Sequence, residues 1–170
     1  MIRLFLIISK KYFNRSFPER LKWNGRNKVP VSNFNSTDKL YRSYKKTDLD
    51  ETKHLKLETI KFPDISCNWD KFSEPEDVWF RSKGTAKDGC YSITVEDARF
   101  NKIANTVHDP IPADDEQYME NYSHVEVRLL PEGKDFTFEP PKGKSLNSKM
   151  KKREYRHHIQ ENYKIEIKAL

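Results

Sequence analysis

The sequence predicts a single small α+β domain, with a mostly antiparallel sheet, short helices and basic terminal extensions. Three observations support this fold class. A chain of 170 residues with 35% hydrophobic residues provides one core of modest size and is too short to bury two. Short alternating runs are separated by proline, glycine and capping residues, which favours hairpins over regular βαβ units. The 5 glycines of the chain form no G-x-G-x-x-G loop, which excludes a Rossmann fold.

Two changes of composition divide the chain. Residues 1–38 are predicted to be a basic N-terminal extension and linker, residues 39–141 an acidic α+β body, and residues 142–170 a basic helix and final strand packed on that body. Within the extension, the apolar run of residues 4–8 is predicted to be a buried strand or a flexible arm, with an organelle transit peptide as the alternative. Residues 24–39 have no periodicity and are predicted to be the linker.

The first elements of the body are predicted on either side of a proline. Residues 55–62 alternate with one slip, which predicts a strand with a bulge that ends at the following proline. Ser73 and Glu76 have the spacing of a capping box, and Pro75 is tolerated in a first helical turn. A short helix is therefore predicted from this cap to about Phe80.

A strand and a helix are predicted to follow in direct succession. Residues 90–95 are predicted to be a strand that is opened by Gly89. Thr94 and Asp97 have the spacing of a second capping box, and apolar side chains recur at helical spacing through residues 100–107. The predicted order is strand, tight junction and helix.

The last predicted elements are a hairpin, a helix and a strand. Residues 122–130 alternate between polar and apolar side chains, which predicts a half-buried strand. A turn follows, and Phe136 and Phe138 are predicted to be the apolar face of its hairpin partner. Residues 148–159 are then predicted to be a helix, and residues 163–169 a final strand.

Charge is segregated along the chain. Lys and Arg outnumber Asp and Glu by 12 to 2 in residues 1–47 and by 9 to 3 in residues 142–170, whereas the acids outnumber the bases by 21 to 11 in residues 48–141. This asymmetry predicts either basic arms that bind a polyanion or arms that fold back on the acidic body as an electrostatic clamp. Solubilising ends are the plainer interpretation.

Both basic ends interleave cations with aromatic rings, a pattern typical of surfaces that attract phosphates and stack bases. Arg42 lies between Tyr41 and Tyr44, and an arginine flanked by aromatic rings can hold a nucleotide phosphate; a purely structural strand is the alternative. The sequence contains no recognised nucleic-acid-binding motif. The candidate nucleic-acid-binding residues are Arg42, Lys149, Lys151, Lys152, Arg153 and Arg156.

The densest group of catalytic residue types comprises His108, Asp109, His124 and Glu126. If a loop over the sheet joins the two halves of this group, both histidines would approach one cleft, as a general base with an orienting carboxylate or as part of a metal site. A capped turn at His108 and a solvated His124 on a strand are the structural alternatives. The chain lacks the P-C-x-x-C pair of zinc deaminases. No metal and no cofactor is predicted.

Two cysteines, Cys67 and Cys90, form no C-x-x-C pair and are predicted to be small core residues with reduced thiols, rather than nucleophiles. Reduced thiols predict an intracellular, cytoplasmic protein. No apolar run approaches the roughly 18 residues that span a bilayer, so no transmembrane segment is predicted. The segment of residues 84–91 lacks the Lys and Ser or Thr of a P-loop.

Two functional hypotheses follow from these patterns. The preferred hypothesis is a non-enzymatic intracellular interaction module whose basic termini bind RNA or DNA, or an acidic protein partner. The alternative is a small hydrolase or transferase that acts on nucleic acid or a nucleotide through the His, Asp and Glu group. Convergence of that group in a cleft favours the enzyme, and its dispersal favours the module.

Overall fold

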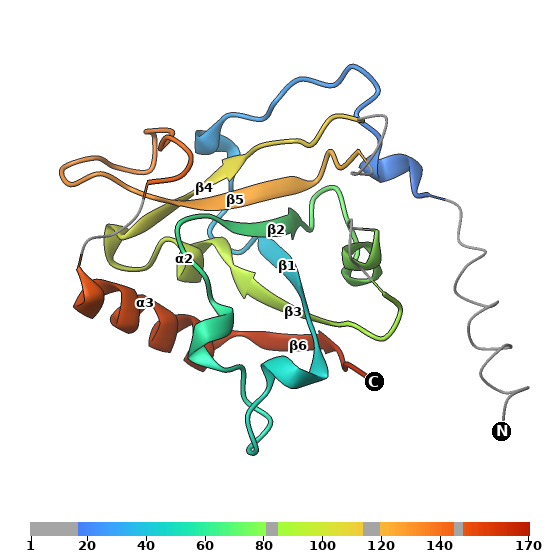
Figure 1. The fold of residues 1–170 in the computed structure, drawn as a ribbon. Coiled ribbons are helices and arrows are strands. Elements are labelled where there is room, and N and C mark those ends of the chain that lie inside the picture. The colour runs from blue at the N-terminus through green and yellow to red at the C-terminus, as the bar shows by residue number, and fades with distance from the viewer. Residues whose placement is uncertain (1–16, 81–84, 114–119, 145–147) are drawn as a thin grey trace, which may run out of the picture.

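The computed structural model describes residues 17–80, 85–113, 120–144 and 148–170. In this part of the chain six strands form one antiparallel sheet, accompanied by two α-helices (Figure 1). The predicted α+β class and the mostly antiparallel sheet are confirmed. The predicted strand at residues 4–8 lies outside the described residues. The strands are β1 (Lys39–Tyr44), β2 (Ile65–Trp69), β3 (Gly89–Thr94), β4 (Ala104–His108), β5 (His124–Leu129) and β6 (Lys164–Ile167), in the spatial order β4-β5-β2-β1-β3-β6.

One face of the sheet packs against α3 (Lys149–Asn162), which lies near the short helix α2 (Val95–Ala98) (Figure 1). Tyr155 and Ile159 of α3 are fully buried in the main core. The Tyr155 hydroxyl donates a hydrogen bond to the carbonyl of Ala98 at 2.9 Å, which fixes α3 to α2. In the described part of the chain no helix is long and apolar enough to cross a membrane.

The predicted helix at residues 148–159 and the predicted strand at residues 163–169 are confirmed by α3 and β6. Ser148 caps α3, because its hydroxyl accepts a hydrogen bond from the backbone N–H of Lys151. The strand predicted at residues 90–95 is also confirmed, as β3. The capping box of Thr94 and Asp97 is present in both directions at the start of α2.

The described part of the N-terminal extension is built into the core. Leu21, Val31 and Phe34 are buried. The ring of Phe34 stacks on the ring of Trp69 in β2, with centroids 4.0 Å apart. Residues 17–38 therefore contribute apolar surface to the domain, in addition to their charge.

Two predicted elements are wrong because backbone turns interrupt the apolar pattern. Residues 55–62 form a 3₁₀ turn at Leu57–Thr59 in place of a strand, although Leu55 and Ile60 are buried as the pattern requires. The helix that was predicted to start after Thr94 and continue through residues 100–107 is much shorter, because α2 ends at Ala98. Asn101 and Lys102 have φ angles of 50° and 53°, which a helix does not accept. The chain then continues as β4.

The prediction of a half-buried strand at residues 122–130 is wrong in its burial, because every residue of β5 is buried. The predicted hairpin partner is also absent. The carbonyls of Phe136 and Phe138 instead accept hydrogen bonds from the side-chain amide of Asn105, at 3.1 and 2.8 Å. These bonds hold an irregular segment beside the sheet, in the place of a further strand.

The cap predicted at Ser73 is displaced by one residue. The 3₁₀ helix Pro75–Trp79 has Glu74 as its N-cap, and Asp77 accepts from the Glu74 backbone N–H. The Ser73 hydroxyl donates back to the Trp69 carbonyl. Strand β2 was not predicted from the sequence.

Because Ile159 fills the main core, we expect Ile159→Ala to lower the free energy of unfolding by about 2–4 kcal/mol. Met150, on the same helix, is 76% exposed, so Met150→Ala changes it by less than about 0.5 kcal/mol. Urea unfolding of both variants tests the placement of α3. Equal stability of the two variants would contradict it.

Candidate functional site

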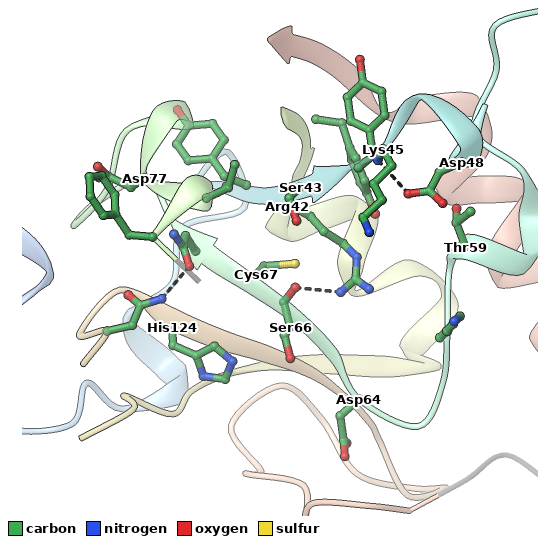
Figure 2. A pocket seen from close by; sticks show the side chains of 18 of the residues that line it. Arg42, Ser43, Lys45, Asp48, Thr59, Asp64, Ser66, Cys67, Asp77 and His124 are labelled. Atoms are coloured by element: carbon green, nitrogen blue, oxygen red, sulfur yellow. Dashed lines mark hydrogen bonds between the residues drawn. The ribbon is translucent and has the colours of Figure 1, made fainter. Parts of the chain in front are cut away.

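A groove opens where strands β1 and β2 separate. The two strands pair only through Leu40 with Trp69 and Tyr41 with Asn68, whereas β1 stays paired with β3 along its whole length. Beyond the second pair the strands diverge. The space between them is about 780 Å³ and extends from residues 42–48 of the chain to His124 (Figure 2). This volume is in the range of small-molecule sites.

Arg42 lies across this separation. Its Nη1 donates to the carbonyl oxygen of Ser66 at 2.8 Å (Figure 2), which satisfies a β2 carbonyl that lies beyond the last pair with β1. In the described part of the chain, Arg42 forms no ion pair with a carboxylate. Its guanidinium lies beside a concave surface and contacts the Cys67 thiol and the Ser66 carbonyl, neither of which neutralises its charge.

The two cysteines near the groove are buried thiols. Cys67 lies beside Arg42 (Figure 2), and burial raises the pKa of its thiol to about 11, against a smaller lowering by Arg42. Burial also raises the pKa of the Cys90 thiol well above its usual range. Both thiols stay protonated near neutral pH, which makes them poor nucleophiles.

His124 is held in one tautomer at the far side of the groove. Its Nδ1 lies 2.6 Å from the backbone carbonyl of Asp109. A carbonyl can only accept, so Nδ1 carries the hydrogen and Nε2 is an acceptor. Burial lowers the pKa of His124, against smaller raising contributions from Asp109 and Glu126. The ring is therefore neutral, and its Nε2 makes no hydrogen bond to a described residue.

Behind His124 lies a closed network of opposite charges. Arg128 donates through Nε to Glu126 at 2.9 Å and through Nη2 to Asp109 at 2.5 Å. Lys142 lies 2.7 Å from the second oxygen of Glu126 and 3.5 Å from Asp109. Glu126 and Arg128 are both buried. Two carboxylates are thus balanced by two cations, as buried charges require.

Asp109, His124 and Glu126 bring potential ligand atoms within 4.8 Å of one another. Their carboxylates, however, are already bound by Arg128 and Lys142. A divalent ion at this place would have to displace the Lys142 ammonium group from Glu126. The donor set fits an internal ion-pair network better than a metal site.

His108, the fourth predicted catalytic residue, lies apart from the other three. It pairs with Val125 in the sheet, whereas Glu126 pairs with Val107, so the side chains of His108 and Glu126 lie on opposite faces. His108 Nδ1 accepts from the Val29 N–H at 2.9 Å, and Nε2 donates to the Tyr122 carbonyl at 2.6 Å. No ring nitrogen is left for a substrate while these bonds persist.

The predicted nucleic-acid-binding residues other than Arg42 lie on α3. Lys149, Lys151 and Arg153 are exposed, and Lys152 and Arg156 are partly exposed. The Nε of Arg156 donates to the Ile60 carbonyl at 2.8 Å. Lys149, Lys151, Arg153 and Arg156 form no ion pair with a described residue. We call Lys149, Lys151, Lys152 and Arg153 the basic face of α3.

The described cations of the N-terminal extension differ from those of α3, because Arg20 and Lys28 form ion pairs with carboxylates of the body. Arg20 donates to Asp77 at 2.7 Å and to Glu74 at 2.9 Å. Lys28 pairs with Glu139. The Arg26 guanidinium lies over the ring of Tyr122, 3.6 Å from its centroid. The described part of this extension therefore forms the electrostatic clamp that charge segregation predicted as one alternative.

Sequence reasoning missed several polar residues of the groove and of the network behind it. Asn68 and Asn121 meet at the groove, where Nδ2 of Asn121 donates to Oδ1 of Asn68 at 2.8 Å. Lys45 extends from the end of β1 toward the same space as Arg42 (Figure 2). Lys142 lies 16 residues from Glu126 in sequence. No local pattern connects these positions, because they meet only when β2 joins β1 to β5.

Comparison with known proteins identifies no relative. No family model, no curated protein and no solved structure matches the chain. Functional inference therefore depends on the geometry and charge of the described residues.

We expect the buried His108 to make stability depend on pH. Burial lowers its pKa in the folded state, so the unfolded chain binds a proton first as the pH falls. The contribution of His108 is complete above about pH 6.5, the usual histidine value, and is lost as the pH falls below it. Thermal unfolding between pH 7.5 and 5.5 measures this slope.

The variant His108→Gln supplies the comparison for this pH dependence. It removes the titrating group, so its melting temperature is lower throughout but falls less steeply between pH 7.5 and 5.5. A slope equal to that of the unmodified protein would contradict the assignment of His108 as a buried neutral ring.

Proposed function

We propose that the protein is a non-enzymatic intracellular module that binds nucleic acid through the basic face of α3. The observation that supports this proposal is the contrast between the two basic ends. Arg20 and Lys28 of the N-terminal extension are ion-paired with the body, whereas Lys149, Lys151 and Arg153 are exposed and have no ion pair with a described residue. Cations without partners attract phosphates by releasing the counterions of the polyanion.

The position of these cations on the helix supports a ligand-binding role. Lys149, Lys151 and Lys152 occupy the first turn of α3, which contains no acidic residue. The N-terminus of a helix carries partial positive charge, so lysines there are unfavourable for the isolated helix. An anion bound at this turn would meet both the lysines and the helix N-terminus. Helix stability alone does not account for this arrangement.

The cations of α3 connect to the groove through the segment of residues 56–61. Arg156 binds the carbonyl of Ile60 in this segment, and Lys56 and Lys61 of the same segment line the groove that contains Arg42. Positive side chains therefore extend from α3 to the separation of β1 and β2. A single strand of nucleic acid that follows them would contact both regions.

The free, buried thiols of Cys67 and Cys90 suit a reducing compartment, so we place this binding inside the cell, in the cytoplasm. An acidic protein is the alternative partner for the same cations. The two partners differ in the strong salt dependence and in the base stacking that only nucleic acid provides.

The test uses the triple variant Lys149→Gln, Lys151→Gln and Arg153→Gln. We expect its affinity for labelled single-stranded RNA to fall at least tenfold at low salt. The slope of log K against log salt should decrease by about 2, since each lost phosphate contact removes about 0.7. Because three charges leave the positive end of the helix, the melting temperature is unchanged or slightly higher.

A matched control replaces three exposed lysines outside α3, Lys53, Lys134 and Lys168, with glutamine. It has the same net charge as the α3 variant. Full affinity in the control and weak affinity in the α3 variant support the proposal. Equal losses of RNA affinity in both variants would show a general charge effect. If the unmodified protein binds no RNA, the proposal fails, and an acidic protein is then the partner to test.

A second candidate function is favoured by the convergence of Asp109, His124 and Glu126. In this hypothesis the protein is a small hydrolase or transferase that acts on nucleic acid or a nucleotide. His124 is neutral, its Nδ1–H is oriented by the Asp109 carbonyl, and Nε2 is open to accept a proton. This is the state that a general base requires.

Incubation with labelled RNA, single-stranded DNA and nucleoside triphosphates tests this second function. The enzyme hypothesis predicts a product that is formed by the unmodified protein and lost in His124→Gln at an unchanged melting temperature. Intact substrates after prolonged incubation would contradict it. A variant that unfolds would instead show that His124 is structural, and Lys142→Gln, at the exposed edge of the network, then provides the second variant.

A further inference from the structure

The two ends of the groove between β1 and β2 differ in chemistry. At one end, Arg42 and Lys45 extend from β1 toward the same space (Figure 2). At the other end lie the side chains of Asn68 and His124, which face each other across the paired strands β2 and β5. One end carries two cations, with the Asp48 carboxylate beside Lys45, and the other carries neutral hydrogen-bonding groups.

Three of the four carboxylates that line the groove already have at least one donor. Asp48 accepts from the backbone N–H of Lys45 at 2.8 Å. Asp77 is bound by Arg20, and Oδ2 of Asp64 accepts from the backbone N–H of Gly143 at 2.9 Å, while its Oδ1 has no partner. Arg42 donates to the Ser66 carbonyl but forms no ion pair with a carboxylate of a described residue, so the charge of its guanidinium is available to an anion from outside.

The Asn68 and His124 side chains supply a donor and an acceptor at the same end of the groove. Oδ1 of Asn68 already accepts from Asn121, which leaves its Nδ2 as the donor. His124 Nδ1 is engaged with the Asp109 carbonyl, which leaves Nε2 as the acceptor. Neither free atom makes a hydrogen bond to a described residue. A nucleobase carries both donors and acceptors on its edge, so it can bind to such a pair of groups.

The separation of the two ends fits one nucleotide. The Arg42 guanidinium is anchored at the Ser66 carbonyl, two residues before Asn68 on β2. Two residues of a strand span about 7 Å, which is on the order of the distance from the phosphate to the base edge in a nucleotide. The groove volume of about 780 Å³ leaves room for the sugar between them.

We propose that this groove binds a single nucleotide unit, with its phosphate at Arg42 and Lys45 and its base at Asn68 and His124. The unit is either a free mononucleotide or the phosphorylated end of a strand, since the two share this chemistry. The site goes beyond the basic face of α3 and does not depend on it. Arginine suits the phosphate end because its planar group donates two parallel hydrogen bonds.

The experiment measures binding by titration calorimetry with the four 5′-ribonucleoside monophosphates, the matching nucleosides, inorganic phosphate, and pentanucleotides with or without a 5′-phosphate. We expect at least one monophosphate or 5′-phosphorylated pentanucleotide to bind at least tenfold tighter than both its unphosphorylated form and inorganic phosphate. Binding of the monophosphate assigns a free nucleotide, and binding of the pentanucleotide alone assigns a strand end; either supports the site.

Variants then locate the binding in the groove. Arg42→Gln should lower the affinity for the phosphorylated probe at least tenfold. Lys45 is exposed, so Lys45→Ala should lower this affinity about threefold without loss of fold. Asn68→Asp should change the preference among the four bases, because it replaces the free donor with an acceptor. The control Lys53→Gln, an exposed lysine outside the groove, should bind as the unmodified protein does.

Two results would overturn the proposal: no phosphorylated probe binds, or Arg42→Gln and Lys45→Ala both bind as tightly as the unmodified protein. If Arg42→Gln fails to fold, Lys45→Ala and Asn68→Asp decide the question. The α3 triple variant should keep its affinity for the phosphorylated probe. Failure of α3 binding and failure of the groove site are therefore distinguishable.

Discussion

Pairing between the basic extension and the acidic body is the interaction on which the rest of the structure depends. Asp77 is 2% exposed, and a carboxylate in that position needs a cation, which Arg20 supplies. Lys28 and Arg26 join the extension to Glu139 and to the ring of Tyr122. Because these contacts also place Leu21 and Phe34 in the core, charge and apolar packing stabilise the same segment. Lys149, Lys151 and Arg153 of α3, in contrast, form no ion pair with a described residue.

The separation of β1 from β2 is a second constraint, because it opens the groove beside Arg42. A continuous sheet would leave no space at Ser66, whereas here an arginine side chain replaces the missing backbone partner. The neighbouring strand β5 carries His124, Glu126 and Arg128 on one face, and the last two are neutralised by each other and by Asp109 and Lys142. This network gives a rigid support to the uncharged ring of His124.

Local patterns predicted the elements with strong caps, and they did not predict elements that depend on distant partners. The Thr94 and Asp97 box identified the start of α2, because a cap is satisfied within one turn. Residues 148–159 were also predicted to be a helix, and the structure adds the Ser148 cap of α3. Strand β2 is short and its burial does not alternate, because Asn68 is buried whereas Ser66 is exposed, so periodicity gave no indication of it. Asp109, His124 and Glu126 were grouped by residue type alone, and pairing of β4 with β5 brings them together. The same pairing sends His108 to the opposite face.

Backbone amide shifts from a ¹⁵N-labelled sample, followed while an unlabelled single-stranded RNA is added at low salt, test most directly which basic end binds nucleic acid. We expect the largest shifts in residues 149–153 and 156, with further shifts around Arg42, Ser66 and Asn68 in the groove. Residues 20–28, of which Arg20 and Lys28 are ion-paired with the body, should shift little. The largest shifts in residues 20–28, with α3 unchanged, would contradict binding through α3.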